Sequence, residues 1–485
     1  MRKLLVVLLV FMFFSSCDTG EPSPKKPETI IINVPEDLLG ASGSTGDEEP
    51  WAWDVIHELG IKWVTRLFRW NEFQTNPGYP GDTPEEELVS GWHWGLDDYV
   101  RKVNQEGMKV IGTIGCSDME AYPPGTTDPG HYVPEEHIPS FVKYVKKIVE
   151  YYSYNEDPEL HVDAWEIWNE GNWADWWRGT PLEFYKLHKA VAEAVREVNP
   201  DVPLFGFVAS FLNYGDWTKN LIDGGYAPRD KLSGAAFHPY ASNPNGTIGH
   251  LDKFSSIVAA GGFNEIWVTE VGFPYNGIGP NVINRRNNGS FMASTIALLA
   301  SRNVSKIFWY QFSRNGLTGS NGGLGVNPDT YTSADPENFF QMTWWWRDSL
   351  ISPWKVKYED SALAFKLCSQ RIPGATYHSD LPKRKGKIPA SIQALYFEGT
   401  GGACTLVLWN DKPSPRTIKV TLPGADRILY DMDYDAWDRT GEKKYKPEMS
   451  SENIDETTTV ELKANVVKFY TWNNTGGKVP EISVP

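Results

Sequence analysis

The sequence predicts an α/β protein with two domains, a (β/α)8 TIM barrel followed by a C-terminal antiparallel β-sandwich. The chain has 485 residues, which is more than one hydrophobic core usually holds. Short apolar segments alternate with helical patterns up to about residue 370. Beyond about residue 375 the pattern changes to short alternating strands separated by Pro, Gly and Asp.

The barrel prediction depends on eight apolar strands, each followed by a helix. The expected strands are 29–34, 62–68, 109–115, 162–168, 203–209, 234–238, 265–271 and 306–312. The expected helices are 50–59, 96–105, 139–152, 181–198, 217–224, 251–260, 291–301 and 338–350, with 361–369 after them. Eight such units favour a closed parallel barrel. An open doubly wound sheet is the alternative, but no glycine-rich phosphate loop follows the first strand.

The C-terminal region has strands expected at 391–397, 403–409, 417–422 and 466–472. About 100 residues of this type are typical of a β-sandwich. We therefore predict a barrel over residues 31–370 and a sandwich over residues 375–475.

The N-terminus has the pattern of an export signal. Arg2 and Lys3 precede an apolar run over 4–14, and Ser15, Ser16 and Cys17 follow. The segment resembles a bacterial lipoprotein signal, with residues 1–17 cleaved before an acylated Cys17 and residues 18–30 forming a flexible tether. This predicts a lipid-anchored protein of the bacterial cell envelope, held at the membrane through Cys17. Ordinary secretion with a chance cysteine is the alternative.

Composition excludes some partners and cofactors. The formal net charge of -16 argues against nucleic acid, and we expect a monomer. The 21 tryptophans suit a carbohydrate site, because a sugar ring has an apolar face that packs on an indole. The nine histidines form neither His-x-His nor His-Glu-x-x-His, so we expect no metal and no cofactor. Cys116, Cys368 and Cys404 are expected to be buried thiols, with a single disulfide as the alternative.

Two glutamates stand at strand ends, where barrel enzymes place their active sites. Glu170 follows the fourth expected strand, and Glu270 lies near the end of the seventh. Two carboxylic acids on either side of a bond are what glycoside hydrolysis requires. Glu166 lies four residues before Glu170, about 13 Å lower at the rise of a strand, so we expect it inside the barrel.

The segments around these glutamates resemble a known enzyme clan. Trp165-Glu166-Ile167-Trp168-Asn169-Glu170-Gly171-Asn172 and Trp267-Val268-Thr269-Glu270-Val271-Gly272-Phe273 are similar to the strand-four and strand-seven motifs of clan A, the retaining glycoside hydrolases with (β/α)8 barrels. Family thirty-nine is the most similar. The resemblance implies that Glu170 is the acid/base and Glu270 the nucleophile, and that the substrate is a plant or microbial oligo- or polysaccharide.

The same resemblance implies a set of substrate-binding residues. His238 and Tyr240 match the strand-six segment that contacts the nucleophile, and Arg66, or Arg69 in its place, matches the arginine that pairs with it. Asn169 matches the amide that binds the sugar 2-hydroxyl. Trp309 matches the tryptophan beneath the sugar. At least one of the tryptophans after Glu170 is expected to stack on substrate, with Trp173 the first candidate and Trp176 and Trp177 the alternatives. We expect Arg66 to keep Glu270 ionised and the pKa of Glu170 to be raised.

Other functions remain as alternatives at this stage. A transglycosylase would use the same scaffold, and a non-catalytic carbohydrate-binding lipoprotein could keep the barrel without the reaction. A metal-dependent hydrolase would need clustered His and Asp ligands. Asp118 and Glu120, after the third strand, are either acceptors for sugar hydroxyls or residues of a surface loop. The loops 71–92, 116–137 and 274–290, which would select the sugar, contain no readable pattern.

Overall fold

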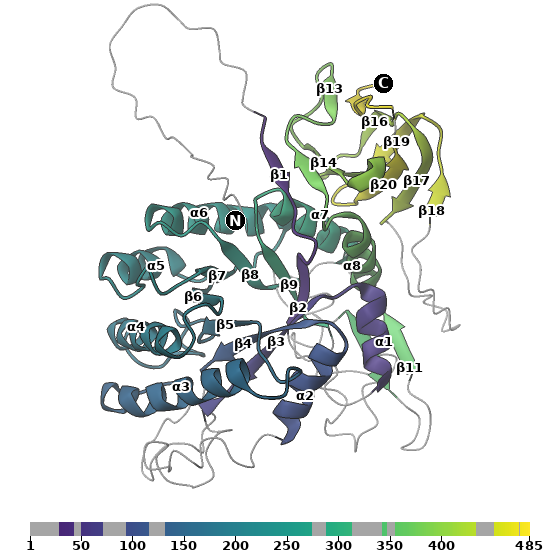
Figure 1. Cartoon of the computed structure of the whole chain (residues 1–485). Helices are drawn as coiled ribbons and strands as arrows, with labels where there is room; N and C mark the ends of the chain where they lie inside the picture. Colours follow the sequence, from purple (N-terminus) through teal and green to yellow (C-terminus); the bar gives the residue numbers. More distant parts are fainter. Residues whose placement is uncertain are drawn as a thin grey trace, which may run out of the picture.

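The computed structural model describes residues 29–42, 50–70, 94–115, 131–273, 288–312, 342–346, 355–432, 451–474 and 476–485. Eight parallel strands close into a barrel in chain order, and helices surround it (Figure 1). The barrel strands are β2 (Leu39–Ser42), β3 (Trp63–Phe68), β4 (Lys109–Ile114), β5 (Ala164–Ile167), β6 (Leu204–Ser210), β7 (Gly234–His238), β8 (Ile266–Val271) and β9 (Lys306–Tyr310).

The helices overlap the expected ranges, although α6 begins seven residues earlier than expected. They are α1 (Pro50–Leu59), α2 (Trp94–Gln105), α3 (Ile138–Tyr154), α4 (Pro181–Val198), α5 (Tyr214–Asp223), α6 (Pro244–Ala260), α7 (Asn288–Ala300) and α8 (Asp360–Arg371). Helix α4 begins with a capping box, in which Thr180 and Glu183 satisfy each other's backbone N–H groups, and with Pro181 in the first turn. Local sequence therefore fixes where this helix begins.

Alternation along each strand separates two cores. One core lies inside the barrel, near the N-terminal ends of the strands. It contains the inward-pointing aromatic side chains of Trp63, Phe205, Trp267 and Phe308. The neighbouring positions on the same strands point outward and pack against the helices in the larger core. Because successive side chains of a strand face opposite sides, one residue of shift moves a side chain from one core to the other.

The C-terminal domain is a sandwich of two sheets. One sheet has the order β1-β12-β14-β15-β20-β17-β18, and the other has the order β13-β21-β16-β19. Their bounds are β1 (Ile31–Asn33), β12 (Thr376–His378), β13 (Lys383–Lys385), β14 (Ile392–Glu398), β15 (Ala403–Asn410), β16 (Arg416–Thr421), β17 (Ala425–Asp431), β18 (Ser451–Asn453), β19 (Thr457–Leu462), β20 (Lys468–Asn473) and β21 (Glu481–Ser483). A separate apolar core lies within it. The predicted fold class is confirmed.

Two expected elements are wrong. The segment 29–34 is not the first barrel strand, because β1 pairs with β12 of the sandwich and β2 takes the barrel position. β2 has the sequence Leu-Gly-Ala-Ser, whose small residues give no strand signal. Within 338–350, β10 (Thr343–Trp346) forms an antiparallel pair with β11 (Lys355–Tyr358) instead of a helix. A run of three tryptophans has no helical period and favours a strand.

Several predictions concern the N-terminus and the cysteines. Residues 1–28, which hold the expected signal, Cys17 and most of the tether, lie outside the described residues, as does Cys116. Cys368 and Cys404 are free and buried, as expected. Within the described ranges, no helix combines the length and the apolar character needed to cross a membrane.

Candidate active site

Glu170 lies in a tight turn directly after β5. Trp168 and Glu170 both have positive φ, 64° and 44°, which non-glycine residues adopt rarely and at some cost. The turn is held by hydrogen bonds from the Trp173 backbone N–H to the Glu170 carbonyl, at 2.8 Å, and from the Trp168 indole to the Trp176 carbonyl, at 2.7 Å. The structure therefore fixes the direction of the Glu170 side chain, which is buried.

Glu270 is the fifth residue of β8 and keeps 22% of its side chain exposed. Tyr240 donates its hydroxyl hydrogen bond to Glu270 Oε2 at 3.0 Å, and Ser42 donates to Oε1 at 3.2 Å. Thr65 in turn donates to the Ser42 hydroxyl at 3.2 Å. The end of β2 and the segment after β7 thus meet at this carboxylate on β8, and Thr65 of β3 supports Ser42.

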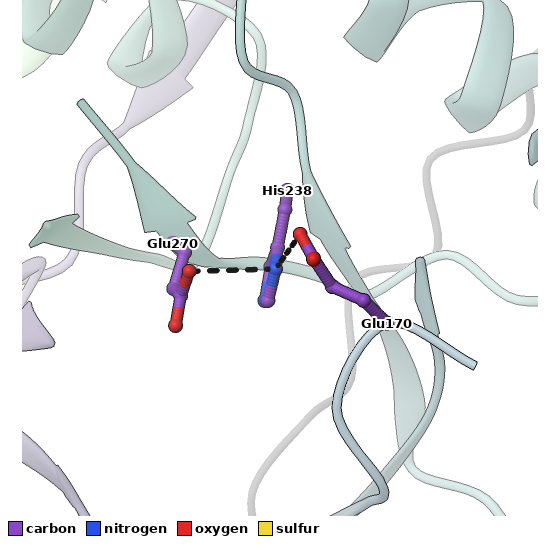
Figure 2. A group of neighbouring side chains, drawn as sticks. All are labelled: Glu170, His238 and Glu270. Atoms are coloured by element: carbon purple, nitrogen blue, oxygen red, sulfur yellow. Dashed lines mark hydrogen bonds and ion pairs between the residues drawn. The ribbon is translucent and has the colours of Figure 1, made fainter. Parts of the chain in front are cut away.

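The two glutamates face each other across His238 (Figure 2). One carboxyl oxygen of Glu170, one of Glu270 and a ring nitrogen of His238 all lie within 4.8 Å of one another. His238 Nδ1 is 2.9 Å from Glu170 Oε1 and 3.7 Å from Glu270 Oε2. A spacing of about 5 Å between two carboxyl groups is that of retaining glycosidases, whereas inverting ones need roughly 6.5–9.5 Å.

Charges in this cluster act strongly on one another because they are buried. Burial alone would lower the pKa of His238, but the carboxylates of Glu270, Glu170 and Glu166 raise it to about 9. Burial raises the pKa of Glu270 to about 7; the charge of Glu170 adds to this rise, while His238 and Tyr240 oppose it. The pKa of Tyr240 is raised by burial and by Glu270, so its hydroxyl stays a donor.

The raised pKa of Glu270 differs from the expectation that Arg66 keeps this group ionised. Arg66 follows Thr65 directly on β3, so the two side chains face opposite sides of the barrel wall. The Arg66 guanidinium lies over the Tyr99 ring of α2, 5.1 Å from the centroid. The described hydrogen bonds to Glu270 come instead from neutral hydroxyl groups. These stabilise a carboxylate less than a paired guanidinium does, so burial dominates.

Trp309 also lies away from the predicted position. It is 1% exposed and packs in the core between barrel and helices, with its ring centroid 5.9 Å from that of Phe273. The next residue, Tyr310, lies on the other face of β9, and its ring centroid is 6.5 Å from that of Tyr240. Tyr310, not Trp309, is therefore the β9 aromatic that lies on the side of the site, next to Tyr240.

The remaining predicted residues lie around the same turn. Asn169 is buried beside Glu170. Trp173 is 37% exposed, whereas Trp177 is buried against Trp168, at 5.4 Å between ring centroids. Trp173 is thus the most exposed tryptophan of this loop, since Trp176 is partly buried. Asp118, Glu120 and the greater part of the three predicted substrate loops lie outside the described residues.

Glu166 lies inside the barrel, as its position in the motif predicted. It is fully buried and accepts a hydrogen bond from Thr113 at 2.6 Å. Burial raises its pKa, while the charge of His238 and the Thr113 hydrogen bond act in the opposite direction; its other oxygen, Oε2, is buried without a hydrogen-bond partner among the described residues. His238 Nε2 lies 3.1 Å from the Thr269 hydroxyl, so a polar layer continues below the two glutamates.

Sequence reasoning missed the hydroxyl residues of this site, Ser42, Thr65, Thr113 and Thr269. The only sequence signal for them is their position in the strand, because every second side chain faces the inside of the barrel. Thr269 directly precedes Glu270 on β8, and Thr65 lies two residues after the inward-facing Trp63 on β3. A search for polar residues at the inward-facing positions of the barrel strands would have found them.

The trio of Glu170, His238 and Glu270 is the one group in the described ranges whose side-chain atoms are close enough to suggest a metal ion. The same atoms are also placed for acid–base chemistry, since His238 Nδ1 lies 2.9 Å from Glu170 Oε1, within hydrogen-bond distance.

No protein-family model and no curated protein matches the sequence. Solved structures do match the fold. A family 39 glycoside hydrolase from the gut symbiont Bacteroides cellulosilyticus WH2 superposes with a TM-score of 0.63 at 19% identity, over 91% of this chain and 81% of that one. A glucosidase from Croceicoccus marinus superposes with a TM-score of 0.58 at 16% sequence identity, over 92% of this chain and 97% of the glucosidase. A GH30 endoxylanase from Clostridium papyrosolvens C71 superposes with a TM-score of 0.53 at 14% sequence identity, over 91% of this chain and 98% of the endoxylanase. These similarities establish a shared barrel-and-sandwich fold.

Proposed function

We propose that this protein is a glycosidase that hydrolyses β-glycosides with retention of configuration, by double displacement. The observation that carries the proposal is the approach of Glu170 and Glu270 to within 4.8 Å at the C-terminal end of a closed barrel. A catalytic water for single displacement needs a wider gap. The fold shared with glycoside hydrolases supports the same reaction class.

The roles of the two glutamates come from the motifs, since the distance between them is symmetrical. Glu270 attacks the anomeric carbon, and Glu170 protonates the leaving oxygen. Water then releases the sugar from the Glu270 ester, with Glu170 as its general base. Tyr240 and Ser42 hold both oxygens of Glu270 in place for attack. Negative charge moves from Glu270 to Glu170 during the first step, and His238 Nδ1 lies between them.

Burial and the charge of Glu170 raise the pKa of Glu270, which favours a proton on this pair of carboxyl groups before substrate binds. The reaction requires this proton on Glu170, because Glu270 attacks as an anion. A sugar bound with its glycosidic oxygen beside Glu170 supplies an acceptor for that proton and selects the productive form.

Two alanine variants test the assignment. On an aryl β-glycoside, Glu270→Ala is expected to retain less than about one thousandth of wild-type kcat, since it removes the nucleophile. Added azide should rescue it with formation of an α-glycosyl azide. Glu170→Ala should be rescued on activated substrates with a β-glycosyl azide, because azide then attacks the glycosyl–enzyme.

The products of rescue decide between outcomes. If the two variants exchange their azide products, the roles are reversed. If wild-type enzyme releases the α-anomer from a β-glycoside, retention is wrong. If no aryl glycoside is cleaved and a titration shows sugar binding alone, the barrel serves as a carbohydrate-binding protein. A product longer than the substrate indicates transglycosylation.

The substrate class is proposed as a plant or microbial oligo- or polysaccharide. The matched structures include proteins described as a glucosidase and an endoxylanase, so glucosides and xylosides come first in a panel. The exposed Trp173 at the mouth supports a site that packs on a sugar ring. A panel of aryl β-glycosides and polysaccharides, with products resolved by length, separates exo from endo action.

We also propose that the enzyme is anchored at the bacterial cell envelope through a lipid on Cys17. The basic residues, apolar run and Ser-Ser-Cys sequence support this location. Mass spectrometry of the mature protein should show an N-terminal Cys17 that carries a diacylglycerol group. In a detergent phase separation the protein should partition into the detergent phase. The Cys17→Ala variant should be released into the soluble fraction. An unmodified mature N-terminus elsewhere would overturn the proposal.

A further inference from the structure

A line of two hydroxyl groups leads across the mouth of the barrel to Glu270. Thr65 Oγ1 donates to Ser42 Oγ at 3.2 Å, and Ser42 Oγ donates to Glu270 Oε1 at 3.2 Å. The three residues come from β3, β2 and β8, and Ser42 is buried. The line thus connects the proposed nucleophile to a threonine whose hydroxyl binds Ser42 and not the carboxylate.

The small residues of β2 place Ser42 where both neighbours can reach it. Gly40 lies beside Trp63, and Ser42 lies beside Tyr310. Residues two apart share a face of the strand, so Gly40 is the inward residue below Ser42. A Cβ at Gly40 would lie 2.7 Å from the Phe308 ring and 2.8 Å from the Trp63 carbonyl oxygen. Any larger residue there would push β2, and Ser42 with it, away from the site.

The hydroxyl of Ser42 has one proton to donate, and rotation about its C–O bond can turn that proton in several directions. The hydrogen bond from Thr65 occupies one lone pair of Ser42, so the Ser42 proton cannot also point toward Thr65. The acceptor within hydrogen-bond distance is Glu270 Oε1, and a carboxylate oxygen only accepts. A hydroxyl that accepts one hydrogen bond is also a stronger donor in the next.

We propose that Thr65 is a positioning residue that acts through Ser42, because its hydroxyl directs the Ser42 proton to Glu270 Oε1. Tyr240 binds the other oxygen, Oε2, at 3.0 Å, so one neutral donor holds each oxygen of the nucleophile. Arg66, the next residue of β3, turns outward over a ring of α2. The inference rests on the proposed hydrolysis, since it assigns the group that orients its nucleophile.

The direction of this line suits the ionised form of Glu270. A proton on Oε1 would have to be donated to Ser42, whose own proton would then turn toward Thr65. The Thr65 proton already points along that path, so the two protons would meet. Donation by Thr65 therefore disfavours a proton on Oε1 and supports the carboxylate, which is the form that attacks.

Other titratable groups face Glu270 from two further strands. His238 ends β7 and Tyr240 follows it, whereas Glu166 is on β5 and Glu170 follows that strand. Burial raises the pKa of Glu270 to about 7; His238 and Tyr240 lower it, and the two other carboxylates raise it. The donor on Oε1 acts in addition to these groups, so its loss should weaken the nucleophile's function without abolishing it.

A double-mutant cycle tests whether Thr65 acts through Ser42. The full-length protein is assayed on an activated aryl β-glycoside, for which release of the sugar limits kcat. Ser42→Ala should lower kcat about ten- to 150-fold, the effect of losing a hydrogen bond to a charged group. Thr65→Val should lower it about two- to tenfold, because the Ser42 hydroxyl remains but is no longer directed. In the Ser42→Ala background, Thr65→Val should change kcat by less than about 1.5-fold.

Two control variants separate this role from packing. Thr65→Ser keeps the hydroxyl and loses a methyl group, so its kcat should stay within about 1.5-fold of wild type. Thr218→Val makes the same change as Thr65→Val at a buried threonine of α5, whose hydroxyl has no partner among the described residues. Its kcat should equal that of wild type. Because a packing defect at Thr65 would add to the Ser42→Ala loss, only the hydroxyl line predicts that the two losses do not add.

Neutron diffraction from crystals of the unliganded, deuterated protein shows the same line without any substrate. At about pH 8, where Glu270 is ionised, the Ser42 deuteron should lie between its Oγ and Glu270 Oε1. The Thr65 deuteron should lie between Oγ1 and Ser42 Oγ. In crystals of Thr65→Val the Ser42 hydroxyl should no longer be confined to the direction of Glu270.

Two results would overturn the inference. The first is a Ser42 deuteron in wild-type protein that points toward Thr65 or away from Glu270. The second is a cycle in which the losses from Ser42→Ala and Thr65→Val add. If the deuterons lie as expected and no glycoside is cleaved, the proposed hydrolysis is wrong and the hydroxyl line is right. If glycosides are cleaved with retention and the losses add, the function stands and the role of Thr65 is wrong.

Discussion

Removal of the Tyr240 hydroxyl isolates one hydrogen bond to the proposed nucleophile. In Tyr240→Phe the 3.0 Å bond to Glu270 Oε2 is lost while the ring remains in place. A hydrogen bond to a charged group contributes about 1.5–3 kcal/mol, so a step that depends on it should slow by roughly ten- to 150-fold. The affected step is release of the sugar, because Glu270 leaves as a carboxylate and regains the bond only then.

The kinetic pattern follows from that assignment. On an activated aryl β-glycoside the first step should change little, since loss of the bond makes Glu270 more basic and a better nucleophile. The glycosyl–enzyme should accumulate, so kcat and KM should both fall and a pre-steady-state burst of the aryl product should appear. Tyr185→Phe is the matched control, because that buried tyrosine donates to the Trp217 carbonyl at 3.2 Å, away from the site.

The pH dependence supplies an independent check on Tyr240→Phe. The Tyr240 hydrogen bond lowers the pKa of Glu270, which burial raises to about 7. Without it the pKa should rise further, so the acidic limb of kcat/KM should move to higher pH. A limb that moves to lower pH, or a kcat that falls with KM unchanged and no burst, would refute this account of Tyr240.

Three further predictions concern the scaffold. Thr180→Ala removes the cap of α4 and should destabilise the barrel by about 1 kcal/mol in urea unfolding, with kcat unchanged; a gain in stability would contradict the capping-box argument. Gly112→Ala would place a methyl group 2.4 Å from the Trp165 ring, so we expect the free energy of unfolding to fall by about 1–3 kcal/mol in the same assay. An unchanged unfolding midpoint would show that Trp165 can move aside without cost. Burial raises the pKa of Cys368, so peptide mapping should find it unmodified by iodoacetamide in native protein at pH 8 and modified in urea; rapid native labelling would disagree.

The fold and the two glutamates could be predicted because their signals are local. Helices such as α4 carry their own caps, and the buried parallel strands β3 to β9 are largely apolar, so seven of the eight barrel strands are visible in one sequence. Glu170 closely follows β5, and Glu270 lies near the C-terminal end of β8. In a barrel, position along a strand is enough to place a residue at the mouth.

The surroundings of these glutamates depend on which face of a strand each residue occupies. Likeness of residue type to the clan motifs predicts Trp309 as the aromatic beneath the sugar and Arg66, or Arg69, as the partner of Glu270. The inward face of β9 is set by Phe308 and that of β3 by Trp63, which places Tyr310 and Thr65 inside. A shift of one residue decides this, and a motif compared by composition does not record it.

Other errors have different physical causes. β2 is short and made of small residues, so its pairing with β3 and β9 depends on contacts remote in sequence. The pKa of Glu270 could not be derived from the list of its neighbours, because burial outweighs them. Sugar selectivity depends on loops without periodicity, where neither propensity nor pattern carries information.

The pairing of β1 with β12 means that the polypeptide passes between the two domains twice. It leaves the sandwich after residue 33 to build the barrel, and it returns at residue 376 beside the strand it left. A cut near residue 375 would therefore not yield two intact halves. The C-terminal piece would lose an edge strand and expose unpaired backbone groups prone to association, while β1 would remain on the barrel piece with no sheet to join. Pulling on the N-terminus would load the hydrogen bonds between β1 and β12 before it reached the barrel.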